Sequence, residues 1–417
     1  MGGQPIGLGA SPPCPSDQQR SFRGDVLMLS TAEWANPFWT NKQHTAMELS
    51  RQGCRVFYVD SLGLRRPTAT ARDLKRLLQR LLRAFRPPRC VAPGVWVWSP
   101  LLVPAARRPW LKALNRFLLR AGLAVWLWLL AFRKPVLWTY NPITSTLLSL
   151  SNYRLVVYHC VDDIASQPGM DAAGIRASER QLCEAADLVF VTSRELLESR
   201  SGFNPGNTYY YPNVVDYAHF ARGDSGHRRA PADLLNGCPA PRIGFVGAIS
   251  SYKVNFPLLH QLARLNPQWS FVLIGSIGEG DPHTNPALLE GLPNLHLLGP
   301  RSYAALPECI AAFDVALIPA PINAYTRAMF PMKFFEYLAA GVPVVATPLP
   351  ALEDFKEFYL QAATPEQFMA AIASILDGSS GLDRQRSDQL ARAYSYQQRT
   401  VWMLQHMADK LSEITSV

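Results

Sequence analysis

The segment from Phe330 to Thr347 constrains the fold more than any other part of the chain. Its sequence, FPMKFFEYLAAGVPVVAT, predicts a short helix followed directly by a buried strand. Pro331 suits the first turn of a helix, where its missing N–H costs no hydrogen bond, and Gly341 suits the left-handed position just after a helix ends. The apolar run from Val342 to Ala346 is typical of a parallel strand that is covered on both faces. The segment therefore predicts an α/β protein.

Short apolar runs alternate with helical patterns along the whole chain, without the turn signals of hairpins. One set begins at Val26 and a second at Arg242, separated by a stretch rich in Gly and Pro. A chain of 417 residues is also long for a single core. We predict two Rossmann-like, doubly wound parallel-sheet domains. The predicted boundaries are a disordered tail at 1–22, a first domain at 23–222, a linker at 223–241, a second domain at 242–385 and C-terminal helices at 386–417.

The composition is that of a globular protein with an anionic partner. Apolar residues make up 48% of the chain and charged residues 18%, and the net charge is +9. The seven cysteines are scattered and odd in number, which indicates a reducing compartment and argues against a disulfide framework or a zinc site. The N-terminal residues lack the apolar core of a signal peptide. We therefore expect a soluble cytoplasmic protein.

Two segments are candidates for contact with the inner face of a membrane. Residues 65–89 form a basic amphipathic pattern, which suits an anionic surface or a lipid-diphosphate acceptor but equally a solvated face over the core. The segment from Phe117 to Phe132 is strongly apolar, yet Arg120 interrupts it and it is shorter than the roughly 20 residues that span a bilayer. We interpret it as a buried or interfacial helix.

The basic pattern at 65–89 could also suggest nucleic acid as the anionic partner. The interleaved exposed aromatic residues typical of nucleic-acid binders are not evident, so we do not expect nucleic-acid binding.

Polar residues follow several predicted strands, at the edge where open parallel sheets bind ligands. In the second domain they are Gly247 to Lys253, Gly275 to Gly280, Gly299 to Tyr303, and Tyr325 to Glu336. In the first domain the sequence Tyr158-His159-Cys160-Val161-Asp162-Asp163 ends a strand. An imidazole and two carboxylates there suit hydroxyl binding or proton transfer. The alternatives are a core histidine and aspartates that cap a helix.

The segment at 333–345 resembles the donor-site helix of retaining GT-B glycosyltransferases, with the pattern Lys-x-x-Glu-Tyr-x-Ala-x-Gly-x-Pro-Val-Val. The resemblance is to the family-4-like, bacterial polysaccharide type of glycosyl transferases group 1, and it implies two domains that face a central cleft. It implies that Glu336 binds the ribose of a nucleotide sugar, while Lys333 and the residues near the helix start face the diphosphate. The alternative is that Lys333 and Glu336 form a surface ion pair.

The loop from Gly247 to Lys253 resembles the Gly-Arg-Leu-x-x-x-Lys loop of the same family. The resemblance implies donor binding by Gly247 and stabilisation of the departing diphosphate by Lys253. Ala248 replaces the usual arginine, and Arg327 or Lys333 is a candidate to supply that charge. The first glutamate of the family's paired-glutamate motif falls at Ala328, so its role is absent or rerouted.

The segment at 158–163 resembles the Tyr-(His/Asp)-x-x-Asp-Asp element of bacterial glycosyltransferases. The resemblance implies that Asp162 and Asp163 hold sugar or acceptor hydroxyls, and that His159 does the same or polarises the attacking hydroxyl. Asp163 and His159 are accordingly predicted catalytic residues, together with Lys253. The loop after the first strand approaches both substrates in this family, which makes Glu33 and Trp34 candidate contacts.

The resemblance implies transfer of a hexose-type sugar from UDP- or GDP-sugar to a glycan or lipid-linked hydroxyl, with retention, in cell-envelope or exopolysaccharide synthesis. Such a hexosyltransferase needs no metal and no cofactor besides the nucleotide sugar. Two alternatives stay open: a nucleotide-sugar 2-epimerase of the same fold, and a non-catalytic binding subunit. The basic region at 65–89 argues mildly against the epimerase, whereas Ala248 and Ala328 favour the binding subunit.

Overall fold

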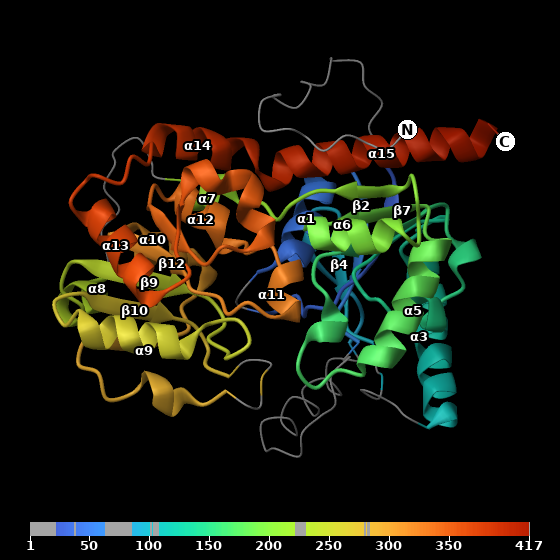
Figure 1. Ribbon diagram of the computed structural model, residues 1–417. Helices are drawn as coiled ribbons and strands as arrows, with labels where there is room; N and C mark the ends of the chain where they lie inside the picture. Colours follow the sequence, from blue (N-terminus) through green and yellow to red (C-terminus); the bar gives the residue numbers. More distant parts are fainter. Residues whose placement is uncertain are drawn as a thin grey trace. The chain divides into compact units, whose positions relative to one another are not determined.

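The computed structural model describes residues 22–36, 39–62, 86–100, 102, 108–221, 231–278, 281 and 284–416 (Figure 1). Residues 1–21 of the predicted tail, most of the predicted basic helix at 65–89 and the start of the predicted linker lie outside these residues. Phe22, the last residue of the predicted tail, is buried in the core of the first unit. The chain divides into two compact units, one of Met1–Tyr211 with Arg399–Val417 and one of Pro212–Gln398.

These divisions differ from the predicted ones at both ends of the second unit. Val215 and Phe220 precede the predicted linker, but they are buried in the core of the second unit. Helix α14 (Arg384–Ala393) also stays with this unit, because its Ala391 lies in the same core. The described part of the predicted linker contains helix α8 (Ala232–Gly237), whose Leu234 is buried in the same core, so it belongs to the second unit.

The first unit contains an eight-stranded sheet in the order β3-β4-β2-β1-β5-β6-β7-β8. All neighbours are parallel except β3 and β4, which form an antiparallel hairpin at one edge. This hairpin was not predicted from the sequence; its turn at Pro93 and Gly94 uses a φ of 73° at the glycine. The strands are β1 (Asp25–Leu29), β2 (Arg55–Val59), β3 (Arg89–Ala92), β4 (Val95–Trp98), β5 (Val136–Thr139), β6 (Val156–Cys160), β7 (Leu188–Val191) and β8 (Thr208–Tyr210).

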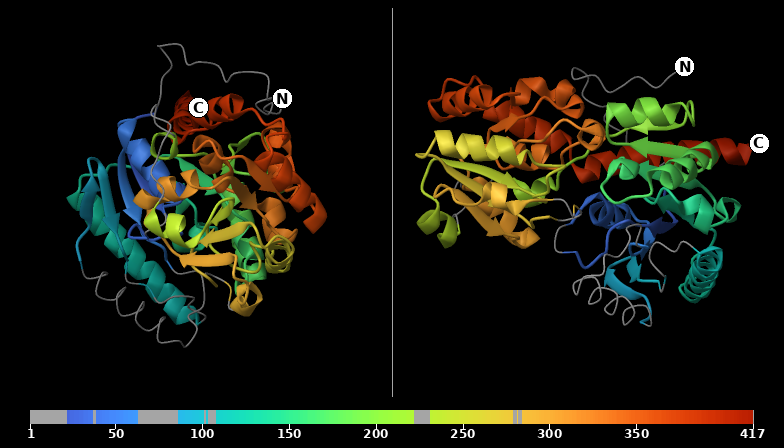
Figure 2. Two further views of the ribbon diagram at one scale, coloured as in Figure 1. Left: turned by 90° about the vertical axis from the view of Figure 1, so that its left-hand side faces the viewer. Right: turned by 60° about the horizontal axis from the view of Figure 1, so that its bottom comes forward.

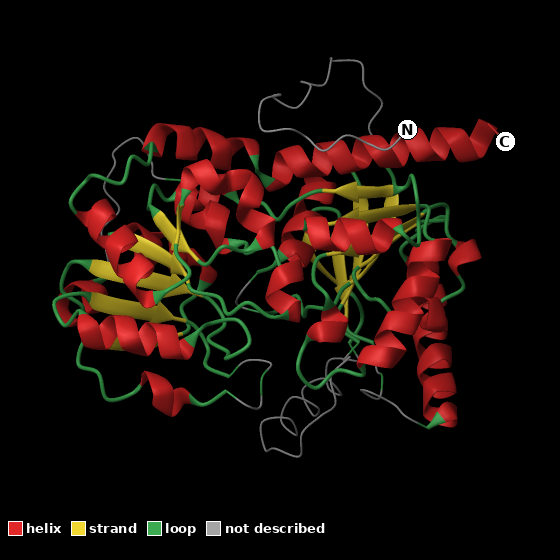
Figure 3. Ribbon diagram, viewed as in Figure 1, coloured by secondary structure: helices red, strands yellow, loops and turns green. Residues whose placement is uncertain are grey.

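Helices cover both faces of this sheet because alternate strand residues point to opposite sides (Figure 3). One core joins Trp138, Val157 and Phe190 of the sheet to α1 and to Met403 and Met407 of α15. The helices of the unit are α1 (Asn41–Arg51), α3 (Pro109–Leu129), α4 (Thr144–Leu147), η1 (Leu150–Asn152), η2 (Ile164–Ser166), α5 (Ala172–Ala185), α6 (Arg194–Ser201) and most of α15 (Tyr396–Ser416).

The second unit contains a six-stranded, fully parallel sheet in the order β11-β10-β9-β12-β13-β14. Five of these strands are predicted from the sequence, whereas β14 has only two residues and no apolar run of its own. The strands are β9 (Arg242–Val246), β10 (Ser270–Ile274), β11 (Leu295–Gly299), β12 (Val315–Ile318), β13 (Val344–Ala346) and β14 (Leu360–Gln361).

Two cores lie on the two faces of this sheet, which has helices on either side (Figure 2). On one face, Val246 and Ile274 pack with helix α12 (Lys333–Ala339); on the other, Phe245 and Leu273 pack with α9 (Phe256–Leu265). The remaining helices are α7 (Tyr217–Phe220), α8 (Ala232–Gly237), η3 (Pro286–Leu289), η4 (Tyr303–Ala305), α10 (Leu306–Ala311), α11 (Ala324–Ala328), η5 (Pro350–Phe358) and α13 (Pro365–Leu376).

The segment that constrains the fold forms the predicted helix and strand, with shifted limits. Gly341 follows α12 with a φ of 69°, the left-handed conformation expected after a helix end. Helix α12 begins at Lys333 rather than at Pro331, and the strand begins at Val344 rather than at Val342. Pro331 instead belongs to a turn, in which its carbonyl accepts a hydrogen bond from the N–H of Phe334.

Candidate functional site

Two glycines bring the ends of β9 and β10 unusually close together. Gly247 follows β9 with a φ of 150°, and Gly275 follows β10 with a φ of 154°. A Cβ atom on Gly275 would collide with the carbonyl oxygen of Gly247. The Gly247 N–H donates to the carbonyl of Ile274 at 2.8 Å, so the two backbones are fixed against each other. This edge is where parallel sheets bind ligands, and it presents backbone rather than side chains.

Lys333 of α12 lies across the edge that Gly247 and Gly275 form, here called the glycine edge. A Cβ atom on Gly247 would collide with the Cε atom of Lys333 and would lie 3.2 Å from its Nζ. The hydroxyl of Tyr337, one turn further along α12, accepts a hydrogen bond of 2.9 Å from the N–H of Val246. The helix is therefore attached to the end of β9, and the ammonium group of Lys333 is held beside the backbone of Gly247.

Glu336 is the acidic member of the same cluster. Its side chain is partly buried, and burial raises the pKa of its carboxyl while Lys333 lowers it. Tyr303, which follows β11, is close enough to Glu336 to be affected by its charge. Burial is the largest cause that raises the pKa of the Tyr303 hydroxyl, and the negative charges of Asp216 and Glu336 raise it further. Gly247, Lys333 and Glu336, all predicted from the sequence, thus lie in one site. Tyr303 and Tyr337 belong to it as well; Tyr337 stands in the family pattern, but no role was predicted for it.

Lys253 lies on the turn that leads from β9 to α9. Its Nζ lies 5.2 Å from the ring centroid of Tyr252 and 5.7 Å from that of Tyr325 on α11. The Asn323 side chain, which caps α11, donates to the carbonyl of Tyr252 at 2.8 Å. The turn of Lys253 and the start of α11 are therefore attached to each other, at the ends of the paired strands β9 and β12.

Helix α11 carries residues that bear on both departures from the family pattern, Ala248 in place of an arginine and Ala328 in place of a glutamate. Arg327 is exposed, so its guanidinium is available to an anion. Ala328, where the family's first glutamate would fall, is only 3% exposed and lies against the core. A carboxylate at that position would be buried, which is costly without a cation beside it. The apolar residue at position 328 fits its surroundings in this chain.

His159 lies inside the first unit, on strand β6, with no exposed surface. Its ring is 4.8 Å from that of Tyr140 and 5.7 Å from that of Trp138. Burial lowers the pKa of the imidazole well below its ordinary value, and Arg399 and Lys42 lower it further. Neither ring nitrogen has a hydrogen-bond partner among the described residues. The structure therefore places His159 as a neutral core residue, the alternative left open above, and this burial argues against a direct catalytic role.

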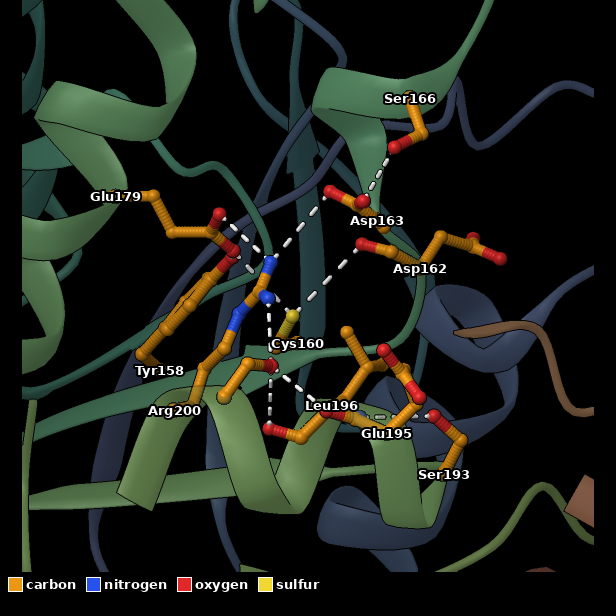
Figure 4. Close-up of polar contacts among 11 residues, drawn as sticks. Tyr158, Cys160, Asp162, Asp163, Ser166, Glu179, Ser193, Glu195, Leu196 and Arg200 are labelled. Carbon is orange, nitrogen blue, oxygen red and sulfur yellow. Dashed lines mark hydrogen bonds and ion pairs between the residues drawn. The ribbon is translucent and has the colours of Figure 1, made fainter. Parts of the chain in front are cut away.

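Asp163 is held by a buried polar network (Figure 4). Arg200 on α6 donates from Nη2 to Oε2 of Glu179 at 2.8 Å, and the same nitrogen lies 3.5 Å from Oδ1 of Asp163. Ser166 donates to the other Asp163 oxygen at 2.5 Å. The carboxylate of Asp163 is thus bound on both sides, which suits a residue that fixes the turn after β6.

Glu179 is the centre of this network. Its Oε1 accepts hydrogen bonds from the Tyr158 hydroxyl at 2.6 Å and from the Cys160 thiol at 3.4 Å. Burial raises the pKa of both donors well above their ordinary values, so both stay protonated and donate. Glu179 and Arg200 were not predicted from the sequence, because they stand on two later helices whose packing against the turn of Asp163 has no local pattern.

Three further predicted residues have distinct surroundings. Figure 4 shows the Asp162 side chain directed away from Arg200 and Asp163. Trp34 is only 8% exposed. Its backbone N–H donates to Oδ1 of Asp60 at 2.7 Å, and the centroid of its ring lies 5.0 Å from that of Tyr58. This burial gives Trp34 a packing role in its loop. Glu33 is partly exposed, and its carbonyl accepts a bond from Gln43 at 3.0 Å.

Residues 240–378 match the family described as glycosyl transferases group 1. The second unit carries a glycosyl transferases group 1 domain. The glycine edge, Lys333, Glu336 and Lys253 all lie within these matched residues.

A curated relative and several solved structures are also similar to this chain. The chain is 28% identical over 262 residues to TuaH of Bacillus subtilis (strain 168), provisionally named a teichuronic acid biosynthesis glycosyltransferase. The match covers 59% of this chain and 64% of TuaH, so it spans less than two thirds of that relative.

Structures of the GT-B fold match nearly the whole chain. Anabaena Alr3699/HepE in complex with UDP and glucose aligns with a TM-score of 0.65 and 17% identity, over 94% of this chain and 100% of HepE. The trehalose 6-phosphate synthase of Burkholderia multivorans aligns with a TM-score of 0.63 and 13% identity, over 94% of this chain and 99% of the synthase. The two parallel-sheet units therefore have the GT-B fold, as predicted.

Among the residues that the structure describes, no three His, Cys, Asp or Glu side chains gather in a way that could hold a metal ion. In the same part of the chain, no helix is both long and apolar enough to cross a membrane.

Proposed function

We propose that this chain is a glycosyltransferase that moves a hexose-type sugar from a nucleoside diphosphate to a hydroxyl group. The observation that carries the proposal is the meeting of Gly247, Lys333 and Glu336 at the ends of β9 and β10, inside the group 1 domain. A bare backbone edge with an ammonium beside it suits a diphosphate, and a carboxylate suits the two hydroxyls of a ribose.

The chemical role of the cations is to stabilise the leaving group. As the bond between sugar and diphosphate breaks, negative charge grows on the diphosphate, and fixed positive charge lowers that barrier. Lys333 and Lys253 are the candidates for this role, with Arg327 as the exposed cation of α11. The reaction written in this way needs neither a metal ion nor a further cofactor.

The donor that we propose is a UDP- or GDP-sugar. The HepE structures, which share the fold, hold UDP, UDP with glucose, and UDP-glucose. We further propose retention at the transferred carbon and a glycan or lipid-linked acceptor in envelope or exopolysaccharide synthesis, which fits the name of TuaH. A cytoplasmic location and contact with the inner face of the membrane complete the proposal.

The test is to incubate the protein with each nucleotide sugar and to follow release of the nucleoside diphosphate, with and without lipid-linked acceptors. A transferase releases the nucleoside diphosphate faster with one acceptor class, and the configuration of the product shows whether the anomer is retained. A 2-epimerase yields the epimeric nucleotide sugar without an acceptor. A binding subunit binds the nucleotide sugar but releases nothing, which would refute the catalytic proposal while leaving the donor site intact.

A further inference from the structure

We infer that the outer face of helix α3 (Pro109–Leu129) docks the protein on an anionic lipid bilayer. This inference concerns a surface of the first unit and does not depend on which nucleotide sugar the second unit binds. Figures 1 and 2 show α3 as one continuous helix at the margin of the first unit.

Helix α3 has two apolar faces, and only one of them packs on the protein. The inner face buries Asn115, Leu119 and Leu123, at intervals of four residues. Gly122 stands on the same side, where a Cβ atom would clash with the ring of Trp98. Since a helix turns 100° per residue, positions 115, 119 and 123 share one side, which is fixed against the sheet.

The opposite side of α3 carries an apolar stripe that faces solvent. It is formed by residues 110, 114, 117, 121, 125 and 128, whose spacing of three and four places them on one side of the helix. Its aromatic members Trp110, Phe117 and Trp128 are 58%, 66% and 77% exposed. Half of the large apolar side chains that are most exposed among the described residues belong to α3: Trp110, Leu114, Phe117, Val125, Trp128 and Leu129.

The charge around the stripe selects the kind of partner. Residues 108–134 contain six lysines and arginines and no acidic residue. Arg116 and Arg120 line one surface hollow with Phe117 and Ala121 of the stripe, and Arg120 donates a hydrogen bond of 2.8 Å to the carbonyl of Leu147. Lys112 is exposed on the side of the helix that holds Asn115 and Leu119. A stripe with exposed tryptophans and flanking cations is typical of a helix that lies in the interface of an anionic membrane.

The same charges disfavour a second copy of the chain as the partner. Two α3 helices packed along their stripes would bring Arg116 and Arg120 of both copies near each other, without any carboxylate on the helix to compensate. Because α3 is not apolar enough to cross a membrane, the bilayer contact would be along its side. Tryptophan side chains prefer this depth of the bilayer.

The test is flotation of the full-length protein with vesicles of phosphatidylcholine, with or without about one third of phosphatidylglycerol. We expect binding to the anionic vesicles only, and loss of that binding at high salt. The variant W110A/F117A/W128A should reduce the bound fraction by about tenfold or more, and K112E/R116E should do the same. The matched control L235A/L265A/L288A removes three large side chains that are similarly exposed on the second unit, and it should float like the wild type.

Three outcomes would overturn the inference: no binding of the wild type, equal binding of the aromatic variant, or a change from dimer to monomer in that variant while its flotation is unchanged. A folding defect is detected by the melting temperature, which the exposed substitutions should leave within a few degrees of the wild type. Nucleotide binding measured on the same samples separates this inference from the proposed function. Flotation without nucleotide binding would refute only the donor site, and nucleotide binding without flotation would refute only the docking face.

Discussion

Lys333 lies across Gly247 so closely that no side chain fits at position 247, where the backbone also has a φ of 150°. This contact joins α12 to the end of β9 and is the basis of the donor site. It depends on an amino acid without a Cβ atom, so it can be tested with a single methyl group.

The substitution Gly247→Ala should therefore displace Lys333 and strain the backbone. We expect the free energy of unfolding to fall by about 1–3 kcal/mol, and the affinity for a nucleoside diphosphate to fall by about tenfold or more. Urea unfolding and calorimetric titration measure the two effects. The control is Gly291→Ala, which has a φ of 82° but open space around its Cβ position. The account is contradicted if both variants bind nucleotide equally well.

Glu336→Gln should separate stability from binding. Because burial raises the pKa of Glu336, the folded protein holds this proton more tightly than the unfolded chain does. The stability contributed by this group is therefore present below the unfolded pKa of about 4.3 and is lost as the pH rises through the raised folded pKa. At neutral pH the variant should be more stable than the wild type, yet bind nucleotide more weakly.

Melting temperatures of the wild type and Glu336→Gln across this pH range provide the measurement. The difference between the two proteins should grow from acid to neutral pH and then stay constant. A difference independent of pH would show that the carboxyl is not perturbed in the folded state. Unchanged nucleotide affinity would remove Glu336 from the site.

Arg200→Met should destabilise the first unit strongly. It leaves the buried carboxylate of Glu179 without its cation, a loss of about 3–5 kcal/mol in typical buried pairs. The control is Arg180→Ala, which breaks an exposed pair with Glu184 and should cost less than about 1 kcal/mol. Urea unfolding compares them. Equal losses for the two variants would show that the network around Asp163 does not stabilise the turn after β6.

His159→Leu should make the protein less sensitive to acid. The lowered pKa of His159 means that its contribution to stability is present above the unfolded pKa of about 6.5 and is lost as the pH falls. Between about pH 7.5 and pH 5, the wild type should therefore lose more unfolding free energy than the variant. Urea titrations at both values measure this. Equal losses would contradict the assignment of His159 as a buried neutral residue.

The sequence predicted the parts of the site that are local in the chain. Gly341 follows α12 in the left-handed conformation that its place after the helix predicts, and Lys333 and Glu336 are one helical turn apart. The contacts between distant segments could not be predicted in this way. Arg200 on α6 contacts Glu179 on α5 and Asp163 on the turn after β6. The charge of Glu336 raises the pKa of Tyr303, which follows a different strand. The packing of helices on the sheets brings each of these groups together.

Two predicted site residues are buried away from the ligand edge. His159 and Trp34 lie on segments that end at the ligand edge, but their side chains turn into the core of the first unit. Alternation along a strand places successive residues on opposite faces, yet it does not show which face is covered by a helix. Helices α1 and α15 cover the face that holds Trp138 and Phe190, the neighbours of His159, and α15 comes from the far end of the chain.

The most direct test of the donor site is a thermal-shift panel of UDP, GDP, CDP and ADP, with their sugars, on the wild type, Gly247→Ala and Gly291→Ala. A ligand that binds only the folded state at a hundredfold excess over its Kd adds about 2.7 kcal/mol of stability. We predict that one nucleoside diphosphate raises the melting temperature of the wild type and of Gly291→Ala, but not that of Gly247→Ala. If no nucleotide shifts the wild type, or if one shifts all three proteins equally, the donor site is not where Gly247 and Lys333 meet.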